Sequence, residues 1–202
     1  MSTPTRGAMH RLKRVCRFLK GHSRPVQEFV MQEPVAQLTV YTDSDWAGDE
    51  VERKSTWSVY LFHGRHLLRS SSSTQAVVAT SVGEAEFYAF VRGCSIGLGA
   101  VSMVKDLGQS MRLVVRTDSS AAKGIASRRG VGKVRHLHTP CLWVQQRVFR
   151  RDLSVEKVAG PLNVADLGTK PLAAAEMHTF LARCGISFKE GRHGLALRVA
   201  EA

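Results

Sequence analysis

Three short segments after residue 37 alternate apolar and polar residues. They are LTVYTDSDW, STWSVYLF and RHLLRSS, and the turn residues Gly48-Asp49 and His63-Gly64 separate them. This alternation predicts three antiparallel strands joined as a meander. Further along the chain, RLVVRTDS and LSVEKVA predict a fourth and a fifth strand.

The residues that come after the meander show the spacing and capping pattern of a helix. Ser81-Val82-Gly83-Glu84 has the form of a capping box and predicts a helix that reaches about Lys105. Gly93, Gly97 and Gly99 are poor helix formers, so we expect close packing against the sheet to explain them. Shorter helices are expected in SAAKGIAS, CLWVQQRVFR and AAAEMHTFLARC, with a further helix or turn at NVADLGTK.

The order of these elements predicts an α/β fold with a mixed five-stranded sheet, three strands antiparallel and two parallel, flanked by helices. The fourth strand returns through a helix, which favours a parallel placement beside the first. Three segments are expected: a helix and connector over 1–34, the α/β domain over 35–172, and a C-terminal helix and tail over 173–202.

Basic residues exceed acidic ones by a wide margin. Twenty-nine Lys and Arg stand against 17 Asp and Glu, which gives a net charge of +12. Residues 112–157 carry eleven of the basic residues and three acids, so the excess is concentrated. Such a balance favours a polyanionic partner, with nucleic acid the commonest, although a solubilising surface charge is the alternative.

The location of the protein is predicted from its cysteines and apolar runs. The four cysteines form no C-x-x-C pair, which argues against a zinc finger and favours free thiols in a reducing compartment. No run approaches eighteen apolar residues, so we expect no membrane span. An intracellular protein, in a cytoplasmic particle or the nucleus and not secreted, is the expectation.

Two of the predicted strands end in the same tripeptide, Thr42-Asp43-Ser44 and Thr117-Asp118-Ser119. If these strands are parallel neighbours, both aspartates emerge at the carboxyl edge of the sheet, where α/β folds usually bind ligands. Two carboxylates there repel each other unless one is protonated or a cation lies between them. Oxygen ligands suit a hard divalent ion such as magnesium.

A third carboxylate is expected from the helix after the meander. Glu84 has the capping position, so Glu86, about 200° further round the helix, is the preferred candidate for the sheet edge. Asp166, in Asn163-Val-Ala-Asp, is a fourth candidate. Each of these acids taken singly could instead be a turn or cap residue, which is their commoner role.

Six blocks of the sequence, taken in order, resemble the ribonuclease H domain of copia-type retrotransposon Pol polyproteins. They are YTDSDWAGD, RKSTWSVYLF, TQAVVATSVGEAEFYA, LVVRTDSSAAKGI, RHLHT and NVADLGTKPL. The resemblance covers about residues 38–172, and MHRLKRVCRFLKG also resembles the end of a reverse transcriptase region. The chain lacks a polymerase Y-x-D-D motif, so we expect the end, or a fragment, of a polyprotein.

The resemblance implies a ribonuclease H-like fold and an endonuclease that cuts the RNA strand of RNA–DNA hybrids. The family's metal-binding catalytic acids fall on Asp43, Glu86, Asp118 and Asp166. They would hold two Mg²⁺ ions, for which Mn²⁺ can substitute, with Asp43 bridging, Glu86 and Asp118 completing one site and Asp166 the other. A reverse transcriptase polymerase domain is a further expected partner, and the oligomeric state is left open.

Selecting RNA requires contact with the 2′-hydroxyl, and gripping the duplex requires cations on its phosphates. Backbone groups near Gly48 and Glu86, and Ser119 or Ser120, are the candidates for the first task. The candidates for the second are Lys123, Arg128, Arg129, Lys133 and Arg135. A turn residue or a solvated surface charge is the plain alternative for each of them.

Two departures from related sequences bear on the function: the first concerns turnover, as judged from cellular relatives, and the second, together with the missing polymerase motif, favours a competing hypothesis. Residues 159–162, before the last acid, contain no histidine, which predicts slow turnover, and the lysines of a family S-K-K-Q block are replaced in Ser71–Gln75. The alternative is a catalytically inactive remnant that binds nucleic acid or acts as a scaffold. An integrase core of the same fold is a third hypothesis, disfavoured because NVADLGTK lacks the late glutamate that such enzymes use.

Overall fold

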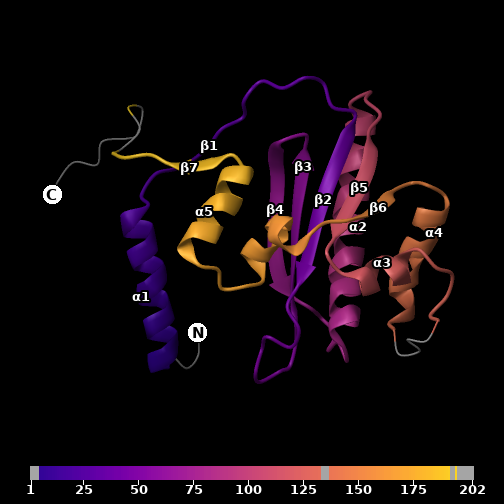
Figure 1. The fold of residues 1–202 in the computed structure, drawn as a ribbon, viewed down its shortest axis with the longest axis horizontal. Helices are drawn as coiled ribbons and strands as arrows, with labels where there is room; N and C mark the ends of the chain where they lie inside the picture. Colours follow the sequence, from indigo (N-terminus) through magenta and orange to yellow (C-terminus); the bar gives the residue numbers. More distant parts are fainter. Residues whose placement is uncertain (1–4, 133–136, 192–193, 195–202) are drawn as a thin grey trace. The chain divides into compact units, whose positions relative to one another are not determined.

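A computed structural model describes residues 5–132, 137–191 and 194, and Figure 1 shows the fold. The chain divides into two compact units, one of residues 30–184 and the other of the residues up to 29 together with those from 185 onward. The segment boundaries expected at residues 34 and 172 stay a prediction, because a compact unit need not coincide with a segment of shared ancestry.

The larger unit contains the five-stranded sheet and its helices. Its strands are β2 (Gln37–Ser44), β3 (Thr56–His63), β4 (His66–Thr74), β5 (Arg112–Thr117) and β6 (Ser154–Lys157). Its α-helices are α2 (Val82–Asp106), α3 (Ser120–Ala126), α4 (Trp143–Phe149) and α5 (Ala174–Arg183). Three short 3₁₀ helices complete it: η1 (Thr139–Leu142), η2 (Gly160–Leu162) and η3 (Val164–Gly168).

The strands lie side by side in the order β4-β3-β2-β5-β6 (Figure 1). β4 pairs antiparallel with β3 and β3 antiparallel with β2, whereas β2–β5 and β5–β6 are parallel. The predicted mixed five-stranded α/β fold is therefore confirmed. Helix α2 packs on β2, β3 and β5, and buries Phe87 and Phe90 in the same core as Val40, Leu113 and Val115.

The glycines of α2 differ in what they contact. A Cβ atom added at Gly93 would lie 2.3 Å from Thr42 Cγ2, and one at Gly97 would lie 2.7 Å from Leu113 Cδ1. Close packing on the sheet thus explains these two glycines, as predicted. At Gly99 an added Cβ meets no atom within 4 Å, so the prediction was wrong there: Gly99 lies on the exposed side of the helix.

By length and composition alone, α2 is also apolar enough to cross a membrane, and it is the one such helix in the described ranges. That test is passed equally by the core helices of folded domains. Ten residues of α2 are buried, two of them the glutamates Glu84 and Glu86. The burial of two carboxyl groups in the domain is typical of a core helix and not of a span in lipid.

The smaller unit contains α1 (Arg6–Gly21), β1 (Pro25–Gln27) and β7 (Ile186–Phe188). Helix α1 lies within the helix and connector expected over 1–34; it begins after Thr5, whose hydroxyl accepts a hydrogen bond from the Ala8 amide, and ends at Gly21. The antiparallel pairing of β1 with β7 was not predicted, because both strands are only three residues long and carry no alternating pattern. Local sequence therefore gave no indication of this small sheet.

Candidate metal centre

Asp43 and Asp118 leave the sheet at the same edge. In the parallel register of β2 and β5, Thr42 pairs with Thr117, so the aspartate that follows each threonine lies at the carboxyl end of its strand. Asp43 is fully buried, and Asp118 is half-buried. The repeated tripeptide in the sequence thus corresponds to two neighbouring carboxylates in space.

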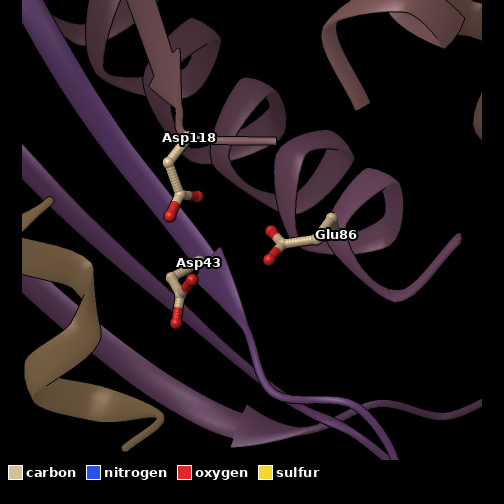
Figure 2. A group of neighbouring side chains, drawn as sticks. All are labelled: Asp43, Glu86 and Asp118. Atoms are coloured by element: carbon tan, nitrogen blue, oxygen red, sulfur yellow. The ribbon is translucent and has the colours of Figure 1, made fainter. Parts of the chain in front are cut away.

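Helix α2 brings a third carboxylate to this edge. The side chains of Asp43, Glu86 and Asp118 point toward one another (Figure 2), and one ligand oxygen of each lies within 4.8 Å of the other two. Glu86 is buried, and its Oε2 atom has no hydrogen-bond partner among the described residues. An unpartnered buried oxygen that faces two other carboxylates is a suitable ligand for a cation.

Glu84 is engaged elsewhere, which distinguishes it from Glu86. Its Oε2 accepts hydrogen bonds of 2.7 Å from the amide and the hydroxyl of Thr80, and its Oε1 accepts one from Tyr88. The Ser81 hydroxyl caps the helix by accepting from the Glu84 amide, as the capping box predicts. The choice of Glu86 as the candidate ligand is consistent with this division of roles.

Asp166 lies in η3. Contacts at both ends of this short helix hold it against the sheet. At its start the Asn163 side chain donates to the Thr42 carbonyl over 3.0 Å. At its end Gly168 packs so closely on β3 that an added Cβ would lie 2.3 Å from Ser58 Oγ. These two contacts place the single turn that carries Asp166 beside the end of β2.

Lys170 joins Asp166 to Asp43. Its ammonium lies 2.9 Å from Asp166 Oδ1 and 3.3 Å from Asp43 Oδ1. The other carboxylate oxygen of Asp43 accepts a hydrogen bond from the hydroxyl of Thr169. Asp166 is thus outside the group of three acids that meet within 4.8 Å, and it is connected to that group through a lysine.

The cluster carries more negative charge than its surroundings neutralise. Burial, followed by the charges of Asp43 and Asp118, raises the pKa of Glu86 to about 9. Burial also raises the pKa of Asp118 and of Asp166 above the usual range, and the charge of Asp43 adds to both shifts. A divalent cation would relieve this repulsion, so the acids present fit a metal site.

Lys170 responds to the same charges in the opposite sense. Partial burial works against its charged form, but its hydrogen bond to Asp166 and the charges of Asp43 and Asp166 outweigh that effect. They raise the pKa of the ammonium above its usual value. Lys170 is therefore a cation throughout the neutral pH range and offsets one of the negative charges.

The raised pKa of Glu86 predicts how the stability of the metal-free protein depends on pH. The folded protein holds this proton more tightly than the unfolded chain does, so its contribution is complete below the unfolded pKa of 4.5 and is lost as pH rises through about 9. In EDTA, the free energy of unfolding should decline across this window, and less steeply in Glu86→Gln. Denaturant unfolding at a series of pH values measures both slopes, and equal slopes would contradict the prediction.

The predicted hydroxyl contacts to nucleic acid already have partners within the protein. Ser119 caps α3, since its Oγ accepts from the Ala122 amide at 3.1 Å. Ser120 Oγ accepts from Lys157 at 2.5 Å and remains exposed. Gly48 is exposed in the loop between β2 and β3. The nucleic-acid role of these residues stays a prediction.

The predicted phosphate contacts lie around α3 and α4. Lys123 is partly exposed, whereas Arg128 turns back to donate to the Val131 carbonyl. Arg129 is exposed and lies over the Phe149 ring, 4.1 Å from its centre. Lys133 and Arg135 lie outside the described residues. Nothing in these positions tests their binding role, which also stays a prediction.

Several residues that build the site were not singled out from the sequence. Gln75 Nε2 donates to Ser44 Oγ and to the Ala85 carbonyl, both at 2.9 Å, and so ties the end of β2 to the helix turn that carries Glu86. Asn163 and Lys170 belong to the block NVADLGTK, but within that block only Asp166 was predicted to act at the site. The four-residue spacing of Asp166 and Lys170 could have indicated their ion pair.

No protein-family model matches the chain. It is 26% identical over 190 residues, or 93% of its length, to the "Retrovirus-related Pol polyprotein from transposon RE1" of Arabidopsis thaliana. The corresponding polyprotein from transposon RE2 of the same plant is 27% identical over 189 residues, or 92% of the chain. The chain spans 13% of the length of each of these relatives.

A solved structure, LC11-RNase H1 in complex with an RNA/DNA hybrid, is 20% identical to the chain, with a TM-score of 0.46. The match covers 66% of this chain and 94% of that one. The resemblance drawn from the sequence motifs agrees with the curated relatives. Over most of its length, the chain is therefore homologous to a part of retrovirus-related Pol polyproteins from copia-type transposons.

Proposed function

We propose that this chain is a ribonuclease H-type endonuclease domain that hydrolyses the RNA strand of RNA–DNA hybrids during retrotransposon reverse transcription. The observation that carries the proposal is the meeting of Asp43, Glu86 and Asp118 from three separate segments, with the Glu86 Oε2 atom buried and unpartnered among the described residues. The carboxylate oxygens of structural acids at strand ends and helix caps normally accept hydrogen bonds. A metal ligand, in contrast, needs an oxygen that is free to bind the ion.

The set of ligands fits magnesium, which prefers oxygen, and manganese, which accepts the same ligands. Two such ions would lower the pKa of the attacking water and stabilise the leaving 3′ oxygen. Asp43 belongs to the three-acid group and also shares Lys170 with Asp166, which supports a role for Asp43 as a ligand of both ions. Glu86 and Asp118 would complete one site, and Asp166 the other.

Grip on the hybrid would come from the basic surface around α3 and α4. An open groove there is lined by two arginines, Arg129 and Arg150, and by the aromatic side chains of Trp143 and Phe149. Arginines bind phosphates and aromatic rings stack on exposed bases, so this combination suits a nucleic-acid strand. Because the curated relatives are Pol polyproteins, we also propose a reverse transcriptase polymerase domain as a partner.

Incubation of the purified chain with a labelled RNA–DNA hybrid tests the proposal. We expect the RNA strand to be cut in Mg²⁺ or Mn²⁺ and to stay intact in EDTA, with single-stranded RNA, RNA duplex and DNA duplex as matched substrates. Cleavage that persists in EDTA would contradict the metal-dependent mechanism. A folded chain that retains the hybrid without cutting it in either metal would favour the inactive, nucleic-acid-binding alternative.

A further inference from the structure

Lys170 contacts only some of the four acids, so the positive charge is unevenly distributed over them. Among the described residues, it alone forms ion pairs with these acids, at 3.3 Å from Asp43 and 2.9 Å from Asp166. Both oxygens of Asp43 are thereby engaged, one by Lys170 and one by the hydroxyl of Thr169. No ammonium in the described part of the chain forms an ion pair with Glu86 or Asp118, although the charge of Lys170 acts on both, so these two acids are less fully neutralised than Asp43 and Asp166.

An ammonium and a divalent ion cannot share the same carboxylates without strong repulsion. Two positive charges about 4 Å apart repel more strongly in a partly buried site than in water, and a divalent ion doubles that repulsion. The ammonium of a lysine sits on a flexible four-carbon stem, and the Lys170 side chain is 41% exposed, so it has solvent into which it can move.

We propose that Lys170 occupies the second cation position in the metal-free protein, so that the free chain binds one divalent ion tightly and a second only by displacing this lysine. The inference rests on the proposed metal-dependent function and adds an order of loading to it. Lys170 is thus a positioning residue: it keeps Asp43 and Asp166 close together and neutralised before the second ion arrives.

Counting bound Mn²⁺ in the absence of nucleic acid tests the inference. Equilibrium dialysis and calorimetry should find one strong site in the wild-type chain and two in Lys170→Met, with the second ion bound about ten-fold more tightly or better than in the wild type. Lys170→Arg, which keeps the charge, should match the wild type. The matched control is Lys105→Met, which removes an exposed charge at the far end of α2, about 28 Å along the helix from Glu86.

Thermal unfolding gives a second readout that does not depend on hydrolysis. In EDTA, Lys170→Met should melt below the wild type, because Asp43 and Asp166 then face each other without a cation. Added Mn²⁺ should close that gap, since the ion replaces the missing ammonium. If Lys170→Met does not fold in EDTA, it is folded and dialysed in Mn²⁺, where the same ion count applies.

Equal Mn²⁺ counts and affinities in the wild type and in Lys170→Met would overturn the inference. If the wild type still binds one ion and cuts the hybrid, the proposed function survives that result. If the wild type binds no Mn²⁺ and does not cut, the proposed function fails together with the inference. The two failures are therefore distinguishable.

Discussion

Asp43→Asn is expected to lower hydrolysis of the RNA–DNA hybrid by on the order of 1,000-fold or more. Asp43 is the acid that we propose to serve both ions. Each 1.4 kcal/mol of metal-dependent stabilisation of the transition state that the variant loses reduces the rate by about ten-fold, and we expect a loss of several kcal/mol. Single-turnover cleavage in Mg²⁺ measures the loss. The change is nearly isosteric, so the effect reports charge and not packing.

The folding of this variant separates chemistry from structure. Asp43 is fully buried beside two other carboxylates, so a neutral amide removes repulsion as well as one ion pair. The free energy of unfolding in EDTA should therefore not fall. Asp106→Asn, the same change at an exposed residue at the end of α2, should cut the hybrid as the wild type does. Cleavage by Asp43→Asn within a few-fold of the wild type would contradict the proposed site.

The second large effect is expected in stability. Gly93→Ala places a Cβ 2.3 Å from Thr42 Cγ2 and 3.1 Å from Val40 Cγ1, both in the core strand β2. Thr42 is fully buried, and its hydroxyl donates to the Arg116 carbonyl, so it cannot rotate away without losing that hydrogen bond. The free energy of unfolding should fall by about 1–3 kcal/mol, which is the usual cost of overpacking a core.

Gly99→Ala in the same helix is the matched control. Its added Cβ meets no atom within 4 Å, so only the gain in helix propensity remains, about 0.5–1 kcal/mol of added stability. Denaturant unfolding of both variants measures the two changes. A loss of stability at both glycines, or at neither, would contradict the packing found on the two sides of α2.

The sheet could be predicted because the pattern that identifies each strand lies within the strand's own few residues. Alternating apolar residues mark each strand, and chain chirality places a strand that returns through a helix parallel to its neighbour. The repeated Thr-Asp-Ser then follows directly as two carboxylates at one edge. The choice of Glu86 over Glu84 was also local, since Ser81 fixes where the helix begins and hence which way each glutamate faces.

The remaining features depend on contacts between distant parts of the chain. Asn163 meets the carbonyl of Thr42 across 121 positions, and Lys170 meets Asp43 across 127. Neither partner has a periodic pattern that could indicate the other. Gly99 is a different case, because it lies two residues, or about 200° of helix, beyond Gly97, so its spacing already indicated that it faces away from the sheet.

The ladder between Pro25–Gln27 and Ile186–Phe188 has a consequence for shortened versions of this protein. The two segments are far apart in the chain, yet each supplies the hydrogen-bonding edge of the other. A fragment trimmed at only one extremity would expose an orphaned strand, with its amides open to pairing with a neighbouring molecule. Trimmed versions should therefore keep both segments or remove both.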